Sequence, residues 1–284
     1  MRVRHVSDTA HWVAYYRALE SDRPDAIFRD PHARRLAGPR GAEIVESDRR
    51  LKDSAWAMIV RTAVFDEIIL DCVRNRGVDV VLNLAAGLDV RPYRLDLPAS
   101  LRWIDVDLPA MIEYRSGVLA DATPVCRVET LRLDLTDRAG RQALFDRVGR
   151  EGGRVLVVTE GLLVYLAREQ VAELASDLHV SPSFALWLAE IASPRLLKLM
   201  RRMYRKSMGP DAPQFRFAPE EGLDFFESLG WHVAEYRSVL EEARRLGRQM
   251  KYAWLIPVYS FVFPWLRSQM RTMSAMLLLE RAGN

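Results

Sequence analysis

The sequence predicts an α/β fold in which a mostly parallel β-sheet is covered by helices on both faces. Through the middle of the chain, short apolar runs of strand length alternate with longer segments whose apolar residues have helical spacing. The 284 residues are enough for one large domain, and their composition, 49% hydrophobic and 28% charged, is that of a globular protein. Right-handed crossovers would bring the carboxyl ends of the parallel strands to one edge of the sheet, where ligands bind in such folds.

Two helices are predicted before the sheet, within an N-terminal helical extension of residues 1–76. Ser7 to Thr9 supply N-cap side chains for the first helix, and Ser21 to Pro31 form a turn-rich link after it. The second helix is expected over about Ser54 to Arg74, where one face is apolar. The apolar positions with helical spacing are Trp12, Val13, Tyr16 and Leu19 in the first helix and Ala57, Val60, Val64, Ile68 and Cys72 in the second.

Seven strands are predicted after this extension, five of them in a central core of residues 77–192. The strands are Val78–Ala85, Leu101–Val106, Val128–Asp134, Val155–Thr159, Phe184–Ile191, His232–Arg237 and about Thr272–Glu280. The helices between the first five are Asp107–Leu119, Arg138–Arg150 and Arg168–Leu178.

After the core we expect a helical lid insertion in residues 193–219. Its basic, Met-rich part, Ser193 to Gly209, is predicted to be a helix that faces the core rather than a substrate groove, and Gln214 to Pro219 a loop. A last helix, Glu220–Leu229, and the final two strands occupy residues 220–284. No long polar linker divides the chain, so residues 1–284 are predicted to form a single domain.

Four successive predicted strands end in residues suited to a nucleoside ligand. The first ends in three small residues, Ala85-Ala86-Gly87, which let backbone N–H groups approach a ligand closely. Asp107 ends the second strand, and a carboxylate there can accept hydrogen bonds from both hydroxyls of a ribose. Asp134-Leu135 and Glu160 end the third and fourth strands. Each acid alone could cap a helix, but the four strand ends together favour a binding site.

The turn after the first strand does not suit a dinucleotide. A G-x-G-x-x-G motif brings the backbone against a pyrophosphate, whereas residues 85–90 contain a single glycine, Gly87. Asp89 adds a negative charge where a phosphate would be repelled. A cofactor with a cationic end is therefore favoured, and S-adenosylmethionine, which has a sulfonium and an ammonium but no phosphate, fits. An NAD-type oxidoreductase is the alternative.

The ordered motifs of the chain resemble those of the leucine carboxyl methyltransferase family, and more closely those of its bacterial S-adenosylmethionine-dependent methyltransferases. The resemblance covers about residues 7–180, and more loosely the rest of the chain. It rests on DTAHWVAYYRALESDRPDAIFRDP at 8–31, Arg61, LNLAAGLDVRPYRL, WIDVDLP, LRLDL and TEGLLVYL. It implies a class I methyltransferase-like Rossmann fold, a seven-stranded sheet with an antiparallel last strand.

The resemblance also implies a role for each site residue. Arg61 would hold the methionine carboxylate of the cofactor, and Glu160 would face its ammonium group. Asp107 would bind the ribose hydroxyls, while Asp134 and the Leu135 backbone would meet the adenine. Ala85 and Gly87 would line the turn beneath the methionine part, and Tyr165 matches a family tyrosine near the transferred methyl. Ala85 departs from the family, which usually has glycine there, so a non-catalytic or regulatory cofactor-binding protein of the same fold stays open.

The methyl acceptor is expected to be a small molecule that reacts through oxygen. No histidine follows a predicted strand end as a general base, so a carboxylate, which is already ionised near neutral pH, is favoured over a hydroxyl. Tyr165, Arg195 or Arg201 could hold such a carboxylate. Aromatic residues indicate either an apolar acceptor or a core or dimer surface, and these are Phe215, Phe217, Tyr252, Trp254 and Trp265.

Composition gives little support to other partners. The net charge is only +3 and no basic run is interleaved with aromatic residues, so no nucleic acid is expected. The histidines lack metal-ligand spacing, and Cys72 and Cys126 are expected to be reduced core residues, so no metal is predicted. The longest apolar stretch, Tyr252 to Leu266, is too short and too rich in proline for a membrane span. No signal peptide is visible, so a cytoplasmic location is expected, and the sequence leaves a homo-oligomer open.

Overall fold

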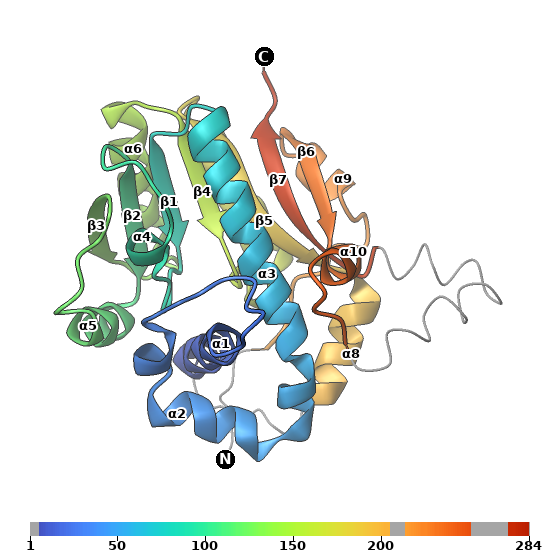
Figure 1. Ribbon diagram of the computed structural model, residues 1–284. Coiled ribbons are helices and arrows are strands. Elements are labelled where there is room, and N and C mark those ends of the chain that lie inside the picture. The colour runs from blue at the N-terminus through green and yellow to red at the C-terminus, as the bar shows by residue number, and fades with distance from the viewer. Residues whose placement is uncertain (1–5, 205–213, 251–271, 284) are drawn as a thin grey trace.

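A computed structural model describes residues 6–204, 214–250 and 272–283 and contains the predicted seven-stranded sheet (Figure 1). The strand order is β3-β2-β1-β4-β5-β7-β6. The pairs among β1 to β5 are parallel, whereas β7 runs antiparallel to both β5 and β6. The strands are β1 (Val80–Leu84), β2 (Arg102–Asp107), β3 (Arg127–Arg132), β4 (Val155–Thr159), β5 (Phe184–Ala192), β6 (Trp231–Ser238) and β7 (Ser274–Arg281). The α/β fold with an antiparallel last strand is therefore confirmed.

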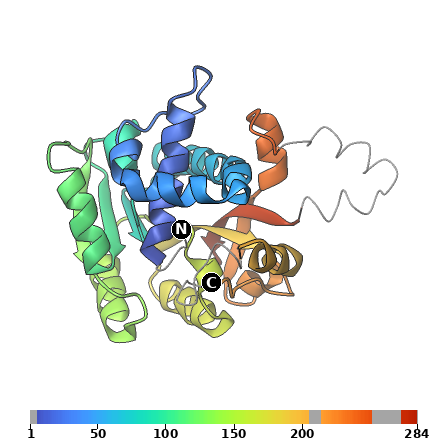
Figure 2. The same cartoon turned by 90° about the horizontal axis from the view of Figure 1, so that it is seen from below.

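Helices cover both faces of this sheet (Figure 2). On one face the apolar core includes residues of α6 (Arg138–Glu151), α7 (Arg168–His179) and α9 (Asp224–Glu227). On the other face it includes residues of α3 (Arg49–Asn75) and α10 (Val239–Arg245). All five residues of β1 and of β4 are buried, as expected of parallel strands between two helical layers.

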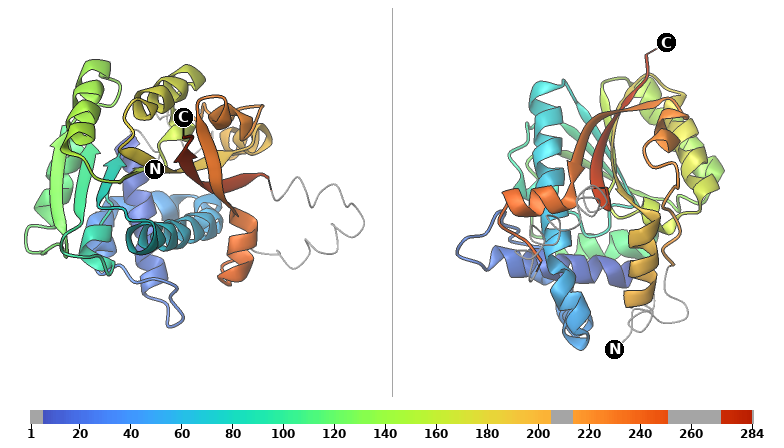
Figure 3. Two further views of the ribbon diagram at one scale, coloured as in Figure 1. Left: turned by 90° about the horizontal axis from the view of Figure 1, so that it is seen from above. Right: turned by 90° about the vertical axis from the view of Figure 1, so that its right-hand side faces the viewer.

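A third apolar cluster lies beneath the carboxyl edge of the sheet. It joins α1 (Val6–Ser21), α2 (Ala33–Ser47) and the start of α3 to α5 (Pro109–Val118). The right-hand view of Figure 3 shows that the N-terminal half of α3 and α8 (Pro194–Tyr204) both continue past this edge. Residues of both helices line a cavity at this edge of the sheet.

Several helices differ from the prediction. Helix α2 was not predicted. It contains Gly38-Pro39, a pair typical of a helix break, and it keeps both helical halves with a kink at Gly38, where φ is +56°. α3 begins five residues earlier than expected, at Arg49, because the Asp48 side chain caps it by accepting from the backbone N–H of Arg50. Of the predicted helix Glu220–Leu229, only Asp224–Glu227 is α-helical, and α10 was not anticipated.

Some predictions fall outside the described residues. The end of the Met-rich segment, residues 205–209, is among them, as are Tyr252, Trp254 and Trp265 and the apolar stretch Tyr252 to Leu266. Cys72 and Cys126 are free and buried, as expected, and burial raises the pKa of their thiols to about 12 and about 11.

Candidate functional site

A cavity of about 900 Å³ lies at the carboxyl edge of the sheet and collects the predicted strand-end residues. Ligand pockets in proteins are typically about 300–1,000 Å³, so this one is large enough for more than a single small molecule. The predicted residues that line it are Arg61, Ala85, Gly87, Asp107, Asp134, Leu135, Glu160 and Tyr165. Residues from β1, β2 and β5, from α1, α3 and α8, and from the segments between the elements share its wall, and Glu160 reaches it directly after β4.

The turn after β1 and the end of β2 form one hydrogen-bonded unit. Asp107 Oδ2 accepts from the Gly87 N–H at 2.5 Å, and Oδ1 accepts from the Leu108 N–H at 2.7 Å. Burial raises the pKa of Asp107, while these two backbone donors oppose that rise. A carboxylate oxygen has a second acceptor position, so Asp107 retains the capacity to accept from a diol in the cavity.

Two residues of this turn have left-handed backbone conformations. Gly87 has a φ of +54°, and Ala85 has a φ of +55° although it carries a Cβ atom. Among the described residues Ala85 is the one non-glycine with a positive φ. The departure from glycine noted at this position thus has a conformational cost, because a Cβ crowds the following carbonyl in the left-handed region.

Arg61 links α3 to the ends of β4 and β5. Its Nε donates to Glu160 at 2.9 Å, and its Nη1 donates to Glu190 at 3.2 Å. Its Nη2 makes no hydrogen bond or ion pair with any residue that the structure describes. Burial alone would lower the pKa of Arg61, but the charges of Glu190 and Glu160 outweigh it and raise this pKa. Arg61 is thus a buried cation in the cavity wall and not the surface residue that is the usual alternative.

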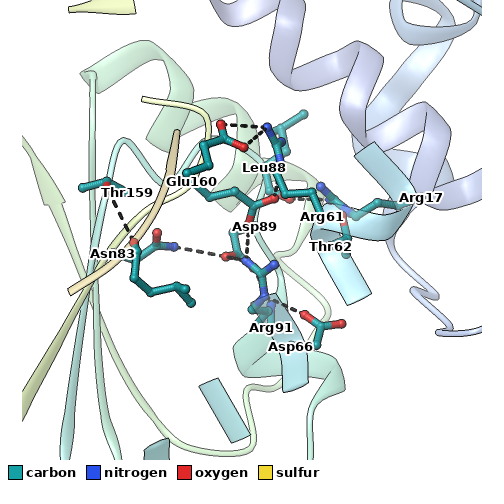
Figure 4. Close-up of polar contacts among 12 residues, drawn as sticks. Arg17, Arg61, Thr62, Asp66, Asn83, Leu88, Asp89, Arg91, Thr159 and Glu160 are labelled. Carbon is teal, nitrogen blue, oxygen red and sulfur yellow. Dashed lines mark hydrogen bonds and ion pairs between the residues drawn. The ribbon is translucent and has the colours of Figure 1, made fainter. Parts of the chain in front are cut away.

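A second buried arginine, Arg91, lies beside this pair (Figure 4). It pairs with Asp66 of α3 at 2.7 Å, with Asp89 at 2.6 Å and with Glu160 at 2.8 Å. Burial would raise the pKa of Glu160, but the charges of Arg91 and Arg61 lower it, so this carboxyl stays ionised. The partners of Arg91 are those of a residue that braces the loop after β1.

Asp89 has a different role from the one expected. The sequence predicted a negative charge that would repel a phosphate, but Asp89 is buried and paired with Arg91, whose charge lowers the pKa of Asp89 against the effect of burial. The negative character instead belongs to the whole cluster. Its carboxylates are those of Asp66, Asp89, Glu160 and Glu190, and its guanidinium groups those of Arg61, Arg91 and Arg94. One carboxylate is in excess, which favours a ligand with net positive charge.

Asp134 and Leu135 occupy the loop after β3 and line the same cavity. Asp134 Oδ1 accepts from the backbone N–H of Thr136 at 2.9 Å. The Leu135 carbonyl accepts from Arg141 Nη1 at 2.8 Å, whereas the Leu135 N–H has no acceptor within the described parts of the chain. An exposed carboxylate thus lies next to a backbone donor without a partner, which is the donor–acceptor pattern that an adenine edge requires.

The residues predicted to hold the acceptor are not all at the cavity. Tyr165, at the end of the 3-10 helix η1 (Leu163–Tyr165), lines it and stacks on Phe215 with ring centroids 5.5 Å apart. Arg195 and Arg201 do not line it; both are exposed on α8, and Arg201 Nε donates to the Phe215 carbonyl at 2.6 Å. The role predicted for these two arginines stays a prediction without support from their position.

The sequence interpretation missed two parts of the cavity wall. Glu190 was not singled out, although a carboxylate in the otherwise apolar strand β5 was a readable signal. Burial and the Glu160 charge raise the pKa of Glu190 against the opposing effect of Arg61. The Met-rich helix α8 was expected to face the core, and Leu197 is buried in the third apolar cluster, against which Met200 and Met203 pack. The same helix also lines the cavity, through Leu196, Leu199 and Met200, which the sequence did not indicate.

The described residues contain neither a candidate metal site nor a candidate membrane span. No group of three or more His, Cys, Asp or Glu side chains in these residues could hold a metal ion. Within the same residues, no helix has the length and apolar character needed to cross a membrane.

The fold and the site define the class of the protein. The strand order and the antiparallel β7 are those of class I methyltransferases, and two solved structures share the fold. A DUF574 family protein from Streptomyces avermitilis has a TM-score of 0.60 at 13% identity, with 97% of each chain covered. A methyltransferase from Thermobifida fusca has a TM-score of 0.54 at 15% identity, with 95% of this chain and 94% of the other covered.

The chain belongs to the leucine carboxyl methyltransferase family, whose sequence profile matches residues 10–179. Two relatives from Mycolicibacterium smegmatis, assigned as S-adenosyl-L-methionine-dependent methyltransferases, are 30% and 32% identical to it. Each comparison covers 80% of this chain and 84% of the relative. The protein is therefore an S-adenosylmethionine-dependent methyltransferase, and the NAD-type and non-catalytic alternatives are set aside.

Proposed function

We propose that this enzyme is an O-methyltransferase that acts on a small molecule, and that the acceptor oxygen belongs to a carboxylate. The observation that carries the proposal is the single cavity in which Asp107, Arg61, Glu160 and Tyr165 meet. Its volume, near the top of the range for ligand sites, leaves space for an acceptor beside the cofactor.

The polar groups of the cavity fit S-adenosylmethionine in the order of its parts. We assign the ribose hydroxyls to Asp107, the adenine edge to Asp134 and the Leu135 N–H, and the backbone beneath the methionine part to Ala85 and Gly87. Arg61 Nη2, which has no described partner, is available to the cofactor carboxylate. Glu160, held ionised by two arginines, is available to the ammonium group.

S-adenosylmethionine supplies a methyl group activated by a sulfonium, and its transfer requires donor and acceptor to be aligned. The residues of the cavity therefore contribute to the reaction by positioning the donor and the acceptor. The excess carboxylate of the Arg61–Arg91 cluster favours the positively charged cofactor. Tyr165, which lines the cavity and is held by the Phe215 ring, is placed to orient the acceptor by its hydroxyl.

A carboxylate acceptor is favoured for a chemical reason and by the family. A carboxylate is ionised near neutral pH, so its methylation needs no general base. The family description names a carboxyl group as the methylated group, and this supports the same choice here. No histidine lines the cavity among the described residues.

A hydroxyl acceptor is the second candidate, and Glu190 is the observation in its favour. Methylation of a hydroxyl requires a base, and Glu190 is a cavity carboxylate whose pKa is raised by burial. Its ion pair with Arg61 opposes that role, because it stabilises the ionised form and occupies both carboxylate oxygens. Phenol in place of a carboxylic acid in the acceptor assays below tests this candidate.

The cofactor assignment is tested by calorimetric titration with S-adenosylmethionine and S-adenosylhomocysteine. Asp107→Ala is expected to raise both dissociation constants by about ten- to a hundredfold, since each hydrogen bond to a charged group contributes about 1.5–3 kcal/mol. Asp96→Ala, at an exposed surface acid paired with Arg74, is the matched control and should leave both constants unchanged. Equal affinity of Asp107→Ala and the unmodified protein would refute the assignment.

A further inference from the structure

The cavity extends well past the cofactor-binding strand ends, between two helices. Its lining residues along α3 run from Arg49 to Thr62 and include Arg50, Asp53, Ser54, Trp56, Ala57, Met58 and Arg61. Along α8 the lining residues are Leu196, Leu199, Met200 and Met203, with the spacing of one helical face. From Arg50 to Arg61 the helix rises about 16 Å, at about 1.5 Å per residue. This elongated part of the cavity, between α3 and α8, is called the channel below.

The face of α8 that lines the channel consists of leucine and methionine side chains. Leu199 on this face is 44% exposed. The charged residues of α8, Arg195, Lys198, Arg201 and Arg202, are all exposed and do not line the channel. An exposed leucine that faces a cavity, on a helix whose charges face elsewhere, indicates a ligand surface.

Polar groups are found at the two ends of the channel. At the strand ends lie Tyr165, stacked on Phe215, and the carboxylate of Glu190. At the far end Arg50 Nη1 donates to the Met203 carbonyl at 3.3 Å and so joins α3 to α8. Between these ends α8 contributes Leu and Met side chains, and α3 contributes Trp56, Ala57 and Met58 together with the polar Asp53 and Ser54. Methionine adapts to ligands of irregular shape.

We infer that the acceptor is an elongated apolar molecule with its reacting oxygen at one end. The oxygen lies at Tyr165, and the chain lies between α3 and α8, along Met58 and the apolar face of α8 that contains Met200. A medium- or long-chain carboxylic acid has this form. The inference rests on the proposed O-methyltransferase function, because the reacting end is assigned from it.

The first test compares acetate, butanoate, octanoate and dodecanoate in two assays. One assay measures methyl transfer from S-adenosylmethionine, and the other measures calorimetric binding of each acid to the protein saturated with S-adenosylhomocysteine. Affinity and kcat/KM are expected to rise by up to about fourfold for each methylene that enters the channel. Equal affinity for acetate and dodecanoate would overturn the inference.

The second test blocks the channel. Met200→Trp should weaken the binding and methylation of dodecanoate at least tenfold while leaving S-adenosylhomocysteine affinity and acetate affinity unchanged. Lys198→Trp, on the exposed face of the same helix, is the matched control and should leave all of these unchanged. The same loss for acetate as for dodecanoate would place the effect of Met200 outside the channel and overturn the inference.

The two assays separate this inference from the proposed function. If dodecanoate binds in a manner sensitive to Met200→Trp but neither the acids nor phenol are methylated, the channel stands and the O-methyltransferase proposal fails. If acetate and phenol are methylated but chain length has no effect, the O-methyltransferase proposal stands and the channel is refuted.

Discussion

Ala85 concentrates backbone strain at the point where the cofactor is expected to lie. Its φ of +55° belongs to the left-handed region, which glycine adopts freely and which costs other residues about 1–2 kcal/mol. The conformation is held by the ends of two strands: the Ala86 N–H donates to Val106 and the Gly87 N–H to Asp107. Alanine therefore does not change the path of the turn but reduces the stability of the protein.

Replacing this residue tests the strain directly. Ala85→Gly is expected to stabilise the protein by about 0.5–1 kcal/mol, because relief of the left-handed strain exceeds the extra entropy that glycine gives the unfolded chain. The free energy of unfolding from urea denaturation measures the change.

The neighbouring alanine provides the control. Ala86 is buried and its φ is not positive, so Ala86→Gly relieves no strain and only adds conformational entropy to the unfolded chain. It should therefore destabilise the protein by about 0.5–1 kcal/mol. If both variants lose stability, the strain at Ala85 is not the dominant effect.

At the scale of elements, α3 connects the sheet to the site. Its C-terminal half packs on the sheet through buried residues such as Phe65 and Ile69, and its N-terminal half lines the cavity with Arg61. Asp66 lies near its middle and binds two arginines of the segment that follows the cofactor turn, Arg91 and Arg94, with distances of 2.7 Å. Helix α3 thereby positions both Arg61, the cation in the cavity wall, and the segment after β1 that contains Arg91 and Arg94.

Asp66 is predicted to be essential to this connection. Asp66→Asn should destabilise the protein by about 3–5 kcal/mol, because it removes the carboxylate that pairs with the buried Arg94 side chain, whereas Arg91 keeps Asp89 and Glu160. Asp71→Asn, at a partly exposed pair with Arg76 on the same helix, should cost no more than about 1 kcal/mol. Urea denaturation of both variants checks the contrast, and similar losses would contradict it.

On the scale of the whole molecule, ligand binding should stabilise the entire fold against unfolding. The reason is that the cavity wall contains residues of the N-terminal helices, the sheet and α8. S-adenosylhomocysteine at a hundredfold excess over its dissociation constant is expected to add about 2.7 kcal/mol to the free energy of unfolding. Thermal denaturation with and without the ligand measures this. NAD at the same concentration should add nothing, and equal stabilisation by NAD would reopen the dinucleotide alternative.

Much of the fold could be predicted because its signals are local. Apolar runs such as Val155–Thr159 and amphipathic helices such as Arg168–His179 have periodicities that short windows reveal. The elements that were missed are those whose local signals conflict with their environment. α2 contains a Gly-Pro pair, and its helical halves are held by packing against α1 and α3.

The candidate site, like the fold, could be predicted only in part. The sequence indicated Asp107, Asp134, Glu160 and the turn at Ala85 to Gly87, since parallel strands bring their carboxyl ends together whatever else the chain does. It could not decide which charges neutralise one another. Asp89 was expected to be unpaired, and Glu190 was overlooked, because ion pairing depends on residues far apart in the chain.

By itself the sequence determined the order of the elements, the edge at which ligands bind and, by resemblance, the cofactor, because these follow from local patterns and from the handedness of the chain. Only the tertiary structure decided that Ala85 has a left-handed backbone, that Arg61 lies between Glu160 and Glu190, and that α8 lines a cavity as well as packing on the core. The physical reason is that backbone conformation, charge balance and cavity shape are set by long-range contacts, which no local window of the sequence contains.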